Sequence, residues 1–116
     1  MPDSNVDWGY RRTTIMTMHE VTIVRIYLSE GETQLKNLMK RLRDWEKLRG
    51  LTVFRGISGY GESGIIHGAE ITDLSLNLPI VVEFFDEDEK INNILDHIND
   101  QIKPGHMLKW SAQINE

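Results

Sequence analysis

Val21-Thr-Ile-Val-Arg-Ile-Tyr-Leu28 is the stretch that decides the fold, because its β-branched and aromatic residues are typical of a strand. A second stretch, Leu78-Pro-Ile-Val-Val-Glu-Phe-Phe85, has the same character. Both stretches place apolar side chains on both faces, and strands lose the alternation of apolar and polar residues when both faces are buried. We therefore expect these two strands to lie in one sheet that is covered on both sides.

Two segments outside these strands carry apolar residues at helical spacing. Each begins with a pair that fits a capping box, Ser29 with Glu32 in the first and Asp86 with Glu89 in the second. Gly50 is a plausible end for the first helix, and Lys103-Pro104-Gly105 ends the second. The apolar stripes are Leu35, Leu38, Met39, Leu42 and Trp45 in the first helix and Ile91, Ile94, Leu95, Ile98 and Ile102 in the second.

Leu51–Ile57 and the alternating segment Leu108–Ile114 are predicted as the remaining strands, and the spacing places Trp110 in the core. The order of elements is then βαββαβ, an α+β fold of the ferredoxin-like type with two helices on one face of an antiparallel sheet. The other face also needs a cover, and self-association is the simplest one. The residues expected in that subunit interface are Ile23, Arg25, Tyr27, Val81, Glu83 and Phe85.

Arg25 and Glu83 interrupt the apolar faces at the middle of their strands. The first and third strands lie side by side in this topology, so we predict that the two side chains pair across the sheet. We also predict that the pair is largely desolvated in the interface. Removal of one partner is then strongly destabilising, because the other charge is left buried and unpaired.

A glycine-rich connection of about twenty residues, 58–77, joins two predicted strands, whereas hairpin loops usually have about 2–5 residues. Within it, Gly59-Tyr-Gly-Glu-Ser-Gly64 matches the G-x-G-x-x-G pattern of dinucleotide-binding domains. That interpretation is disfavoured, because the motif follows a second strand and no helical period comes after it. Two readings stay open for the glycines: an anion-binding nest beside Arg55, or simple tolerance of positive φ.

Four short motifs follow one another along the chain: Arg55-Gly-Ile-Ser-Gly-Tyr-Gly61, Ile66-His67, Leu74-Ser75 and Leu78-Pro-Ile-Val-Val-Glu83. In this order and at this spacing they resemble the domain-of-unknown-function 190 family, a relative of the nitrogen regulatory protein P-II. The resemblance covers about residues 20–116. It implies a P-II-like signalling protein that is a homotrimer, with the 58–77 connection as a T-loop that contacts a partner protein, either a membrane transporter or an enzyme.

The resemblance also implies a ligand site between subunits, where P-II proteins bind adenine nucleotides. An adenine nucleotide is accordingly the first candidate effector. The start of the connection forms one wall of that site, and the turn before the last strand forms another. The turn here, Lys103-Pro-Gly-His-Met107, differs from the Gly-Asp-Gly-Lys pattern of P-II. The expected ligand-binding residues are Arg55, Gly56, Gly59, Gly61, His67, Lys103 and His106.

The composition limits the alternatives. The 116 residues fit one domain, which we expect to span 19–116 after a flexible N-terminal arm of residues 1–18. A net charge of -5 argues against a nucleic-acid surface, including an RNA-binding sheet with the same strand order. The absence of cysteine, of a long apolar run and of a secretion signal favours a cytoplasmic protein without a membrane span.

No nucleophile–base pair is recognisable, so we expect no catalytic residue and no enzyme activity. The histidines are scattered, and a resident metal is not expected. The alternative is a metal-binding trimer or a small enzyme on the same scaffold, like the divalent-cation tolerance proteins. That alternative requires His67, Glu70 and Glu83 to converge.

Overall fold

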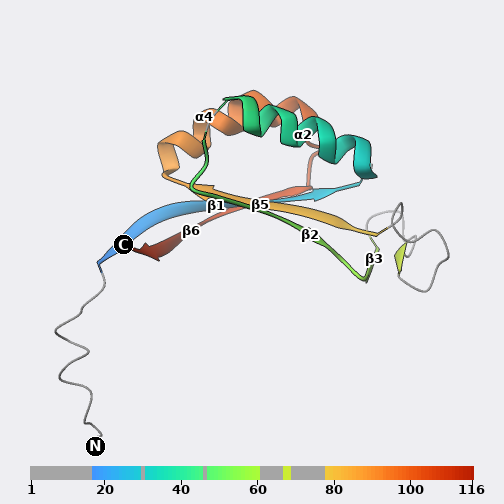
Figure 1. Cartoon of the computed structure of the whole chain (residues 1–116), viewed down its shortest axis with the longest axis horizontal. Coiled ribbons are helices and arrows are strands. Elements are labelled where there is room, and N and C mark those ends of the chain that lie inside the picture. Colours follow the sequence, from blue (N-terminus) through green and yellow to red (C-terminus); the bar gives the residue numbers. More distant parts are fainter. Residues whose placement is uncertain (1–16, 30, 46, 61–66, 69–77) are drawn as a thin grey trace, which may run out of the picture.

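A four-stranded antiparallel sheet, visible in the computed structural model in Figure 1, organises the chain. The structure describes residues 17–29, 31–45, 47–60, 67–68 and 78–116. The strand order is β2-β5-β1-β6, so the two strands with two apolar faces occupy the centre. The predicted ferredoxin-like α+β fold is therefore confirmed. The strands are β1 (Met18–Leu28), β2 (Gly50–Arg55), β5 (Ile80–Asp86) and β6 (Met107–Asn115).

Two helices, α2 (Gly31–Trp45) and α4 (Asp88–Ile98), lie over the same face of this sheet, and a short 3-10 turn, η1 (Asn99–Gln101), follows α4 (Figure 1). The hydrophobic core lies between the helices and the sheet. Phe84 is the largest completely buried side chain among the described residues. The strands contribute alternate residues, as a sheet with one helix-covered face requires. The buried core residues are Val24, Ile26, Leu28, Leu38, Leu42, Ile80, Val82, Phe84, Ile91, Ile94 and Ile98.

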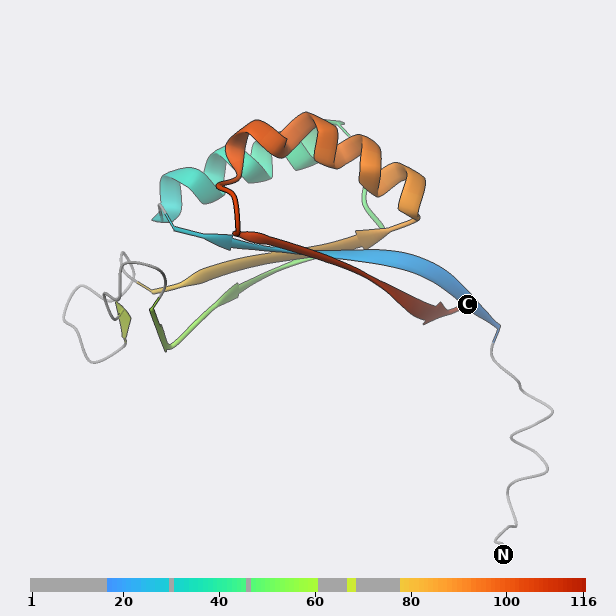
Figure 2. The same ribbon diagram turned by 180° about the vertical axis from the view of Figure 1, so that it is seen from behind.

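The opposite face of the sheet, called the open face below, carries no helix among the described residues (Figure 2). Trp110 lies on this face, because it is opposite Ile23 in the β1–β6 register, so the prediction that places it in the core is wrong. Several large apolar side chains of this face remain partly exposed in the single chain: Tyr27 (41 %), Phe54 (48 %), Leu108 (51 %) and Trp110 (38 %).

Both predicted capping boxes are replaced by other contacts. At the start of α2, the backbone N–H of Ser29 donates to the Gln34 side chain over 3.1 Å, and the Glu32 carboxylate binds Arg55. Glu87, not Asp86, occupies the N-cap position of α4. The sequence spacing fitted the motif, but partners from β2 and from other turns compete for the same carboxylates.

Asp86 is buried at the end of β5, with an exposed fraction of 4 %. Its carboxylate accepts the backbone N–H groups of Glu87, over 2.8 Å, and Arg49, over 3.1 Å. The Lys90 ammonium lies 3.2 Å from the same carboxylate. Burial alone would raise the pKa of Asp86, but these three contacts outweigh it and lower the pKa. Asp86 thus ties the turn before β2 to the first turn of α4.

A two-stranded ribbon marks the base of the predicted T-loop-like connection. β3 (Ser58–Gly59) pairs with β4 (His67–Gly68) in antiparallel register. Residues 61–66 and 69–77 of the connection lie outside the described part of the chain, as do residues 1–16 of the predicted arm. β1 already begins at Met18, the last residue assigned to that arm. The division into arm and domain stays a prediction.

Candidate functional site

The predicted ligand residues form two groups at one end of the sheet. Arg55, Gly56 and Gly59 form the first, called the β2-end group, at the end of β2. Residues 103–106 form the second, called the β6 turn, just before β6. Arg55 is opposite Ile80, and Ile80 is opposite Leu28 at the end of β1. Met107, the first residue of β6, is opposite Ile26, two residues before Leu28. Both groups therefore lie at the end of the sheet where β1 ends. Because β2 and β6 are the two edge strands, three strand spacings of about 4.8 Å separate them, roughly 14 Å.

The glycines of the β2-end group allow Pro79 to approach closely. A Cβ atom at Gly59 would lie 3.0 Å from the Pro79 Cγ, and one at Gly56 would lie 3.2 Å from the same atom. The backbone N–H of Gly56 donates to the Pro79 carbonyl over 2.8 Å. This N–H is therefore engaged within the chain, which removes one donor from the predicted anion nest. A tight joint between β2 and β5 explains these two glycines.

Arg55 carries the positive charge of the β2-end group, and its guanidinium is hydrogen-bonded to the Glu32 carboxylate. This hydrogen bond raises the pKa of Arg55 and lowers the pKa of Glu32. Both side chains are partly exposed to solvent. An anion that approaches Arg55 must therefore compete with Glu32. The sequence did not suggest this pair, because Glu32 also fitted a helix cap.

The β6 turn is held by its own backbone. The N–H of His106 donates to the Lys103 carbonyl over 3.1 Å, and the His106 carbonyl accepts the N–H of Tyr27 over 2.8 Å. Gly105 has φ +84°, a conformation that favours glycine. The His106 Nδ1 lies 3.2 Å from the Pro104 carbonyl, so its ring is turned toward the same turn. Lys103 is exposed and supplies the cation of this group.

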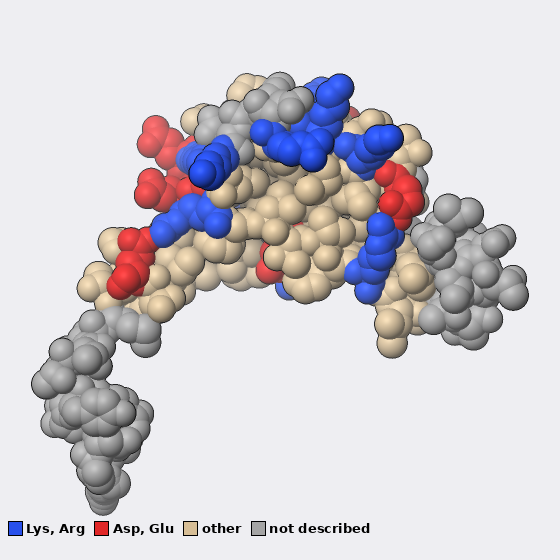
Figure 3. All heavy atoms as spheres, viewed as in Figure 1, with Lys and Arg blue, Asp and Glu red and all other residues tan. Residues whose placement is uncertain are grey.

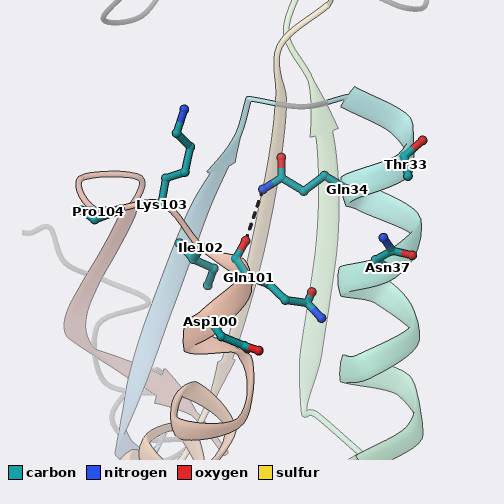
Figure 4. Close-up of a pocket in the computed structure, with 8 residues that line it drawn as sticks. All are labelled: Thr33, Gln34, Asn37, Asp100, Gln101, Ile102, Lys103 and Pro104. Carbon is teal, nitrogen blue, oxygen red and sulfur yellow. Dashed lines mark hydrogen bonds between the residues drawn. The ribbon is translucent and has the colours of Figure 1, made fainter.

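A pocket of about 490 Å³ lies beside the β6 turn, between the first turns of α2 and the end of the η1 segment (Figure 4). Thr33, Gln34 and Asn37 line it from α2, and residues 100–104 line it from the other side. Gln34 reaches across from α2, and its amide donates to the Gln101 carbonyl over 3.4 Å. Of the predicted ligand residues, this pocket includes only Lys103.

The predicted ion pair on the open face is confirmed. Arg25 is opposite Glu83 in the β1–β5 register, and its Nε and Nη2 donate to Glu83 Oε1 over 2.9 and 2.7 Å. The guanidinium also lies 5.4 Å from the centre of the Trp110 ring, a cation–π distance. The hydrogen bond to Glu83, followed by one to Tyr27, raises the pKa of Arg25. In the single chain the Arg25 side chain is 38 % exposed and the Glu83 side chain 27 % exposed, so the burial of this pair in an interface stays a prediction.

The metal-binding alternative finds no assembled site in the described part of the chain, where no three acidic or histidine side chains gather around a common point. Glu83, one of its three required residues, is bound to Arg25. The backbone of His67 pairs with Gly59, whereas Glu70 and Gly61 lie outside the described residues. None of the helices in the described ranges is long and apolar enough to span a membrane.

Comparison with known proteins identifies the class of this chain. The model of the domain-of-unknown-function 190 family, described as "Uncharacterized ACR", matches residues 21–114, and the chain belongs to that family. A UPF0166 protein of Methanocaldococcus jannaschii is 40 % identical over 96 residues, which cover 78 % of this chain and 87 % of the relative. This confirms the family resemblance that the sequence motifs carried.

Solved structures of P-II-like proteins share the fold. One is CPII of Thiomonas intermedia K12, a nitrogen regulatory PII-like protein bound to ADP, AMP and bicarbonate. It has a TM-score of 0.64 and 14 % identity, and the match covers 88 % of this chain and 92 % of that protein. Another is a putative PII-like signaling protein of Thermus thermophilus, with a TM-score of 0.57, 17 % identity, and coverage of 87 % and 93 %. At these identities the likeness concerns the fold.

Sequence reasoning missed three features of this region: Glu32 as the partner of Arg55, Pro79 as the neighbour of the glycines, and the pocket beside the β6 turn. Only the last left a signal in the sequence. Thr33 and Asn37 are polar residues four positions apart, which places them on one side of a helix. The element that faces them, however, is more than sixty residues away along the chain.

Proposed function

We propose that three copies of this chain close into a ring and bind a small anionic effector, in the first instance an adenine nucleotide, in the clefts between copies. We further propose that the ring is a non-catalytic signalling protein that contacts a partner protein through the 58–77 connection. The observation that carries the proposal is the position of the two cationic groups. They lie at the same end of the sheet but on opposite edges.

The strand directions favour a head-to-tail ring. All neighbouring strands are antiparallel, so β2 and β6 run in opposite directions. When the β2 edge of one copy lies beside the β6 edge of the next, the end of β2 meets the start of β6. Arg55 of one copy then faces the β6 turn of its neighbour. A contact between two different edges generates a ring when the rotation closes.

The exposed apolar residues of the open face favour closure of the ring. Tyr27, Phe54 and Trp110 form part of an exposed apolar surface, which soluble proteins usually bury in an interface. Figure 3, in which the sheet is seen edge-on, shows Lys and Arg side chains over the helical layer. The charged layer thus faces solvent in the proposed ring, and the apolar face turns toward the centre.

The charged side chains of the cleft can bind an anion, but the cleft is not strongly basic. Arg55 and Lys103 supply a guanidinium and an ammonium, the usual partners of phosphate groups. Glu32 opposes a phosphate at Arg55. The bound ADP and AMP in the T. intermedia relative support a nucleotide as the effector class. Binding transmits a signal only if the nucleotide favours one conformation of the connection over another.

Light scattering and calorimetry test the proposal together. We expect a trimer by light scattering, and saturable heat with at least one of ATP, ADP, AMP and cyclic nucleotides. Arg55→Ala and Lys103→Ala should each weaken binding by about tenfold, the effect of one lost charge-assisted hydrogen bond. Arg43→Ala is the matched control, because Arg43 is an exposed arginine on α2 away from both groups.

Glu32→Gln should have the opposite effect and tighten nucleotide binding by a few-fold, because the competing carboxylate is neutralised while the side-chain shape is kept. A stable single chain in dilute buffer would rule out the ring. A well-folded trimer that gives no heat with any of these nucleotides would remove the nucleotide and leave the assembly.

A further inference from the structure

We propose that the pocket between α2 and η1 is a second ligand site, and that its ligand is a small uncharged molecule with neighbouring hydroxyl groups, such as a polyol, a sugar or a ribose. All the residues that line the pocket come from one chain, because α2 forms one wall and the 100–104 segment the other. The proposal therefore does not depend on the ring or on the cleft between copies.

The chemistry of the walls is polar and nearly balanced in charge. Three amide side chains, Gln34, Asn37 and Gln101, and one hydroxyl, Thr33, line the pocket. The single carboxylate, Asp100, is offset by the single ammonium, Lys103. A primary amide offers both a donor and an acceptor, as does a hydroxyl group. A ligand with several hydroxyl groups can pair with these donors and acceptors. A multiply charged phosphate is less suited, because the attraction of the Lys103 ammonium is offset by repulsion from the Asp100 carboxylate.

Thr33 and Asn37 are exposed to solvent, so their side chains can exchange hydrogen bonds with water for hydrogen bonds with a ligand. Thr33, Asn37 and Gln101 make no side-chain hydrogen bond with any other described residue. Gln101 and Asp100 extend from the η1 side toward α2, while Asn37 stands on the facing helix (Figure 4). The Asp100 carboxylate lies 3.9 Å from an Arg41 nitrogen, too far for a strong hydrogen bond, so it retains acceptor capacity.

The size of the pocket also fits a small ligand. Its volume of about 490 Å³ lies within the range of roughly 300–1,000 Å³ that is usual for small-molecule sites. Ile102 and Pro104 provide the apolar part of the wall, against which the carbon skeleton of a sugar can rest. No aromatic side chain is among the described residues that line the pocket, which disfavours a ligand that binds by ring stacking.

Gln34 links this pocket to the β6 turn. It accepts the N–H of Ser29 and donates to the Gln101 carbonyl, and so connects the start of α2 to the segment that leads into Lys103. A ligand that hydrogen-bonds the Gln34 amide would compete with one of these contacts. Occupancy of the pocket should then change the position of the β6 turn.

Nuclear magnetic resonance of the full chain tests the proposal, because side-chain amides report directly on the pocket. The probes are myo-inositol, D-glucose and methyl β-D-ribofuranoside, with glycine and inorganic phosphate as comparison ligands. We expect at least one of the three hydroxylated probes to shift the amide signals of Gln34, Asn37 and Gln101 in a saturable way. A response to the ribofuranoside alone would indicate a nucleoside-derived ligand, and a response to the others a free polyol or sugar.

Asn37→Leu should weaken that binding by about tenfold, and Thr33→Val by a few-fold, since each removes one hydrogen-bonding group. Asn93→Leu is the matched control, because Asn93 is an exposed asparagine on α4 that does not line the pocket. If none of the three probes gives a saturable shift through the millimolar range, the proposal is overturned and the pocket is a solvated groove. Shifts only with glycine or phosphate, or equal weakening by all three variants, would also overturn it.

Discussion

The two faces of the sheet carry similar apolar residues but have different surroundings. On the helix-covered face, Val24 and Phe84 are completely buried in the single chain. On the open face, Tyr27 and Trp110 keep about 40 % of their surface exposed. A residue pattern therefore states which side chains need burial, but it does not state whether the same chain or a second copy provides it.

The two faces differ again in their polar groups. The helix-covered face places its carboxylate at the rim, where Asp86 accepts two backbone N–H groups. The open face places an ion pair, Arg25 with Glu83, at its centre beside Trp110. An ion pair at the middle of an apolar surface adds less stability than apolar packing, but it restricts the orientations in which a partner surface fits. The helix-covered face stabilises the single chain, and we infer that the open face mediates specific association between copies.

The largest expected effect separates the two faces by stability. Phe84→Ala should lower the free energy of unfolding by about 3–5 kcal/mol, because it leaves a cavity in a closely packed core. Phe54→Ala, on the open face, should leave the fold of the single chain intact and weaken assembly. Chemical denaturation and light scattering measure the two effects. If Phe54→Ala lowers the free energy of unfolding of the single chain as much as Phe84→Ala does, both faces stabilise the single chain and the distinction between them is wrong.

A smaller loss is expected for Asp86→Asn, about 1–3 kcal/mol, since the buried hydrogen bonds lose their charged acceptor. The folded-state pKa of Asp86 is lowered, so its contribution is fully present above the unfolded-state pKa of about 4 and is lost as the pH falls through the folded-state value. The stability difference between the wild type and the variant should thus shrink on acidification below about pH 4. A difference that stays constant from about pH 7 to about pH 3 would contradict this assignment.

The open-face ion pair should affect assembly more than the stability of a single chain. Arg25→Leu leaves Glu83 unpaired in the proposed interface and should weaken association by at least about tenfold. Arg25→Leu combined with Glu83→Leu should recover much of that loss, because no charge is then left unpaired. Sedimentation velocity over a range of concentrations measures both variants. An unchanged assembly state for Arg25→Leu would show that the pair lies outside any interface.

Much of the fold was predictable because it depends on local periodicity. The two-sided apolar strands indicated the central pair β1 and β5, and the helical stripes indicated α2 and α4 within a few residues of their observed ends. The Arg25–Glu83 pair followed from topology alone, since central positions of adjacent strands must face each other. The capping boxes failed for a different reason: the sequence spacing is only local, and Arg55 and Arg49 arrive from elsewhere to bind Glu32 and Asp86.

The candidate site was predictable only in part. The motifs around Arg55 and Lys103 named its two halves, but the sequence did not show that these halves lie on opposite edges of the sheet. The register of β6 was also needed to place Trp110 beside Arg25 on the open face. Such placements depend on pairings between residues far apart along the chain, for which neighbouring residues carry no signal.

The sequence by itself determined which segments become strands and helices, which faces are apolar and which family the chain resembles, because periodicity and motif spacing are properties of the chain. The tertiary structure alone decided that Glu32 neutralises Arg55, that Pro79 packs on Gly56 and Gly59, and that α2 and the 100–104 segment line a polar pocket. Each of these contacts joins segments about twenty or more residues apart, and only the folded backbone brings them within reach.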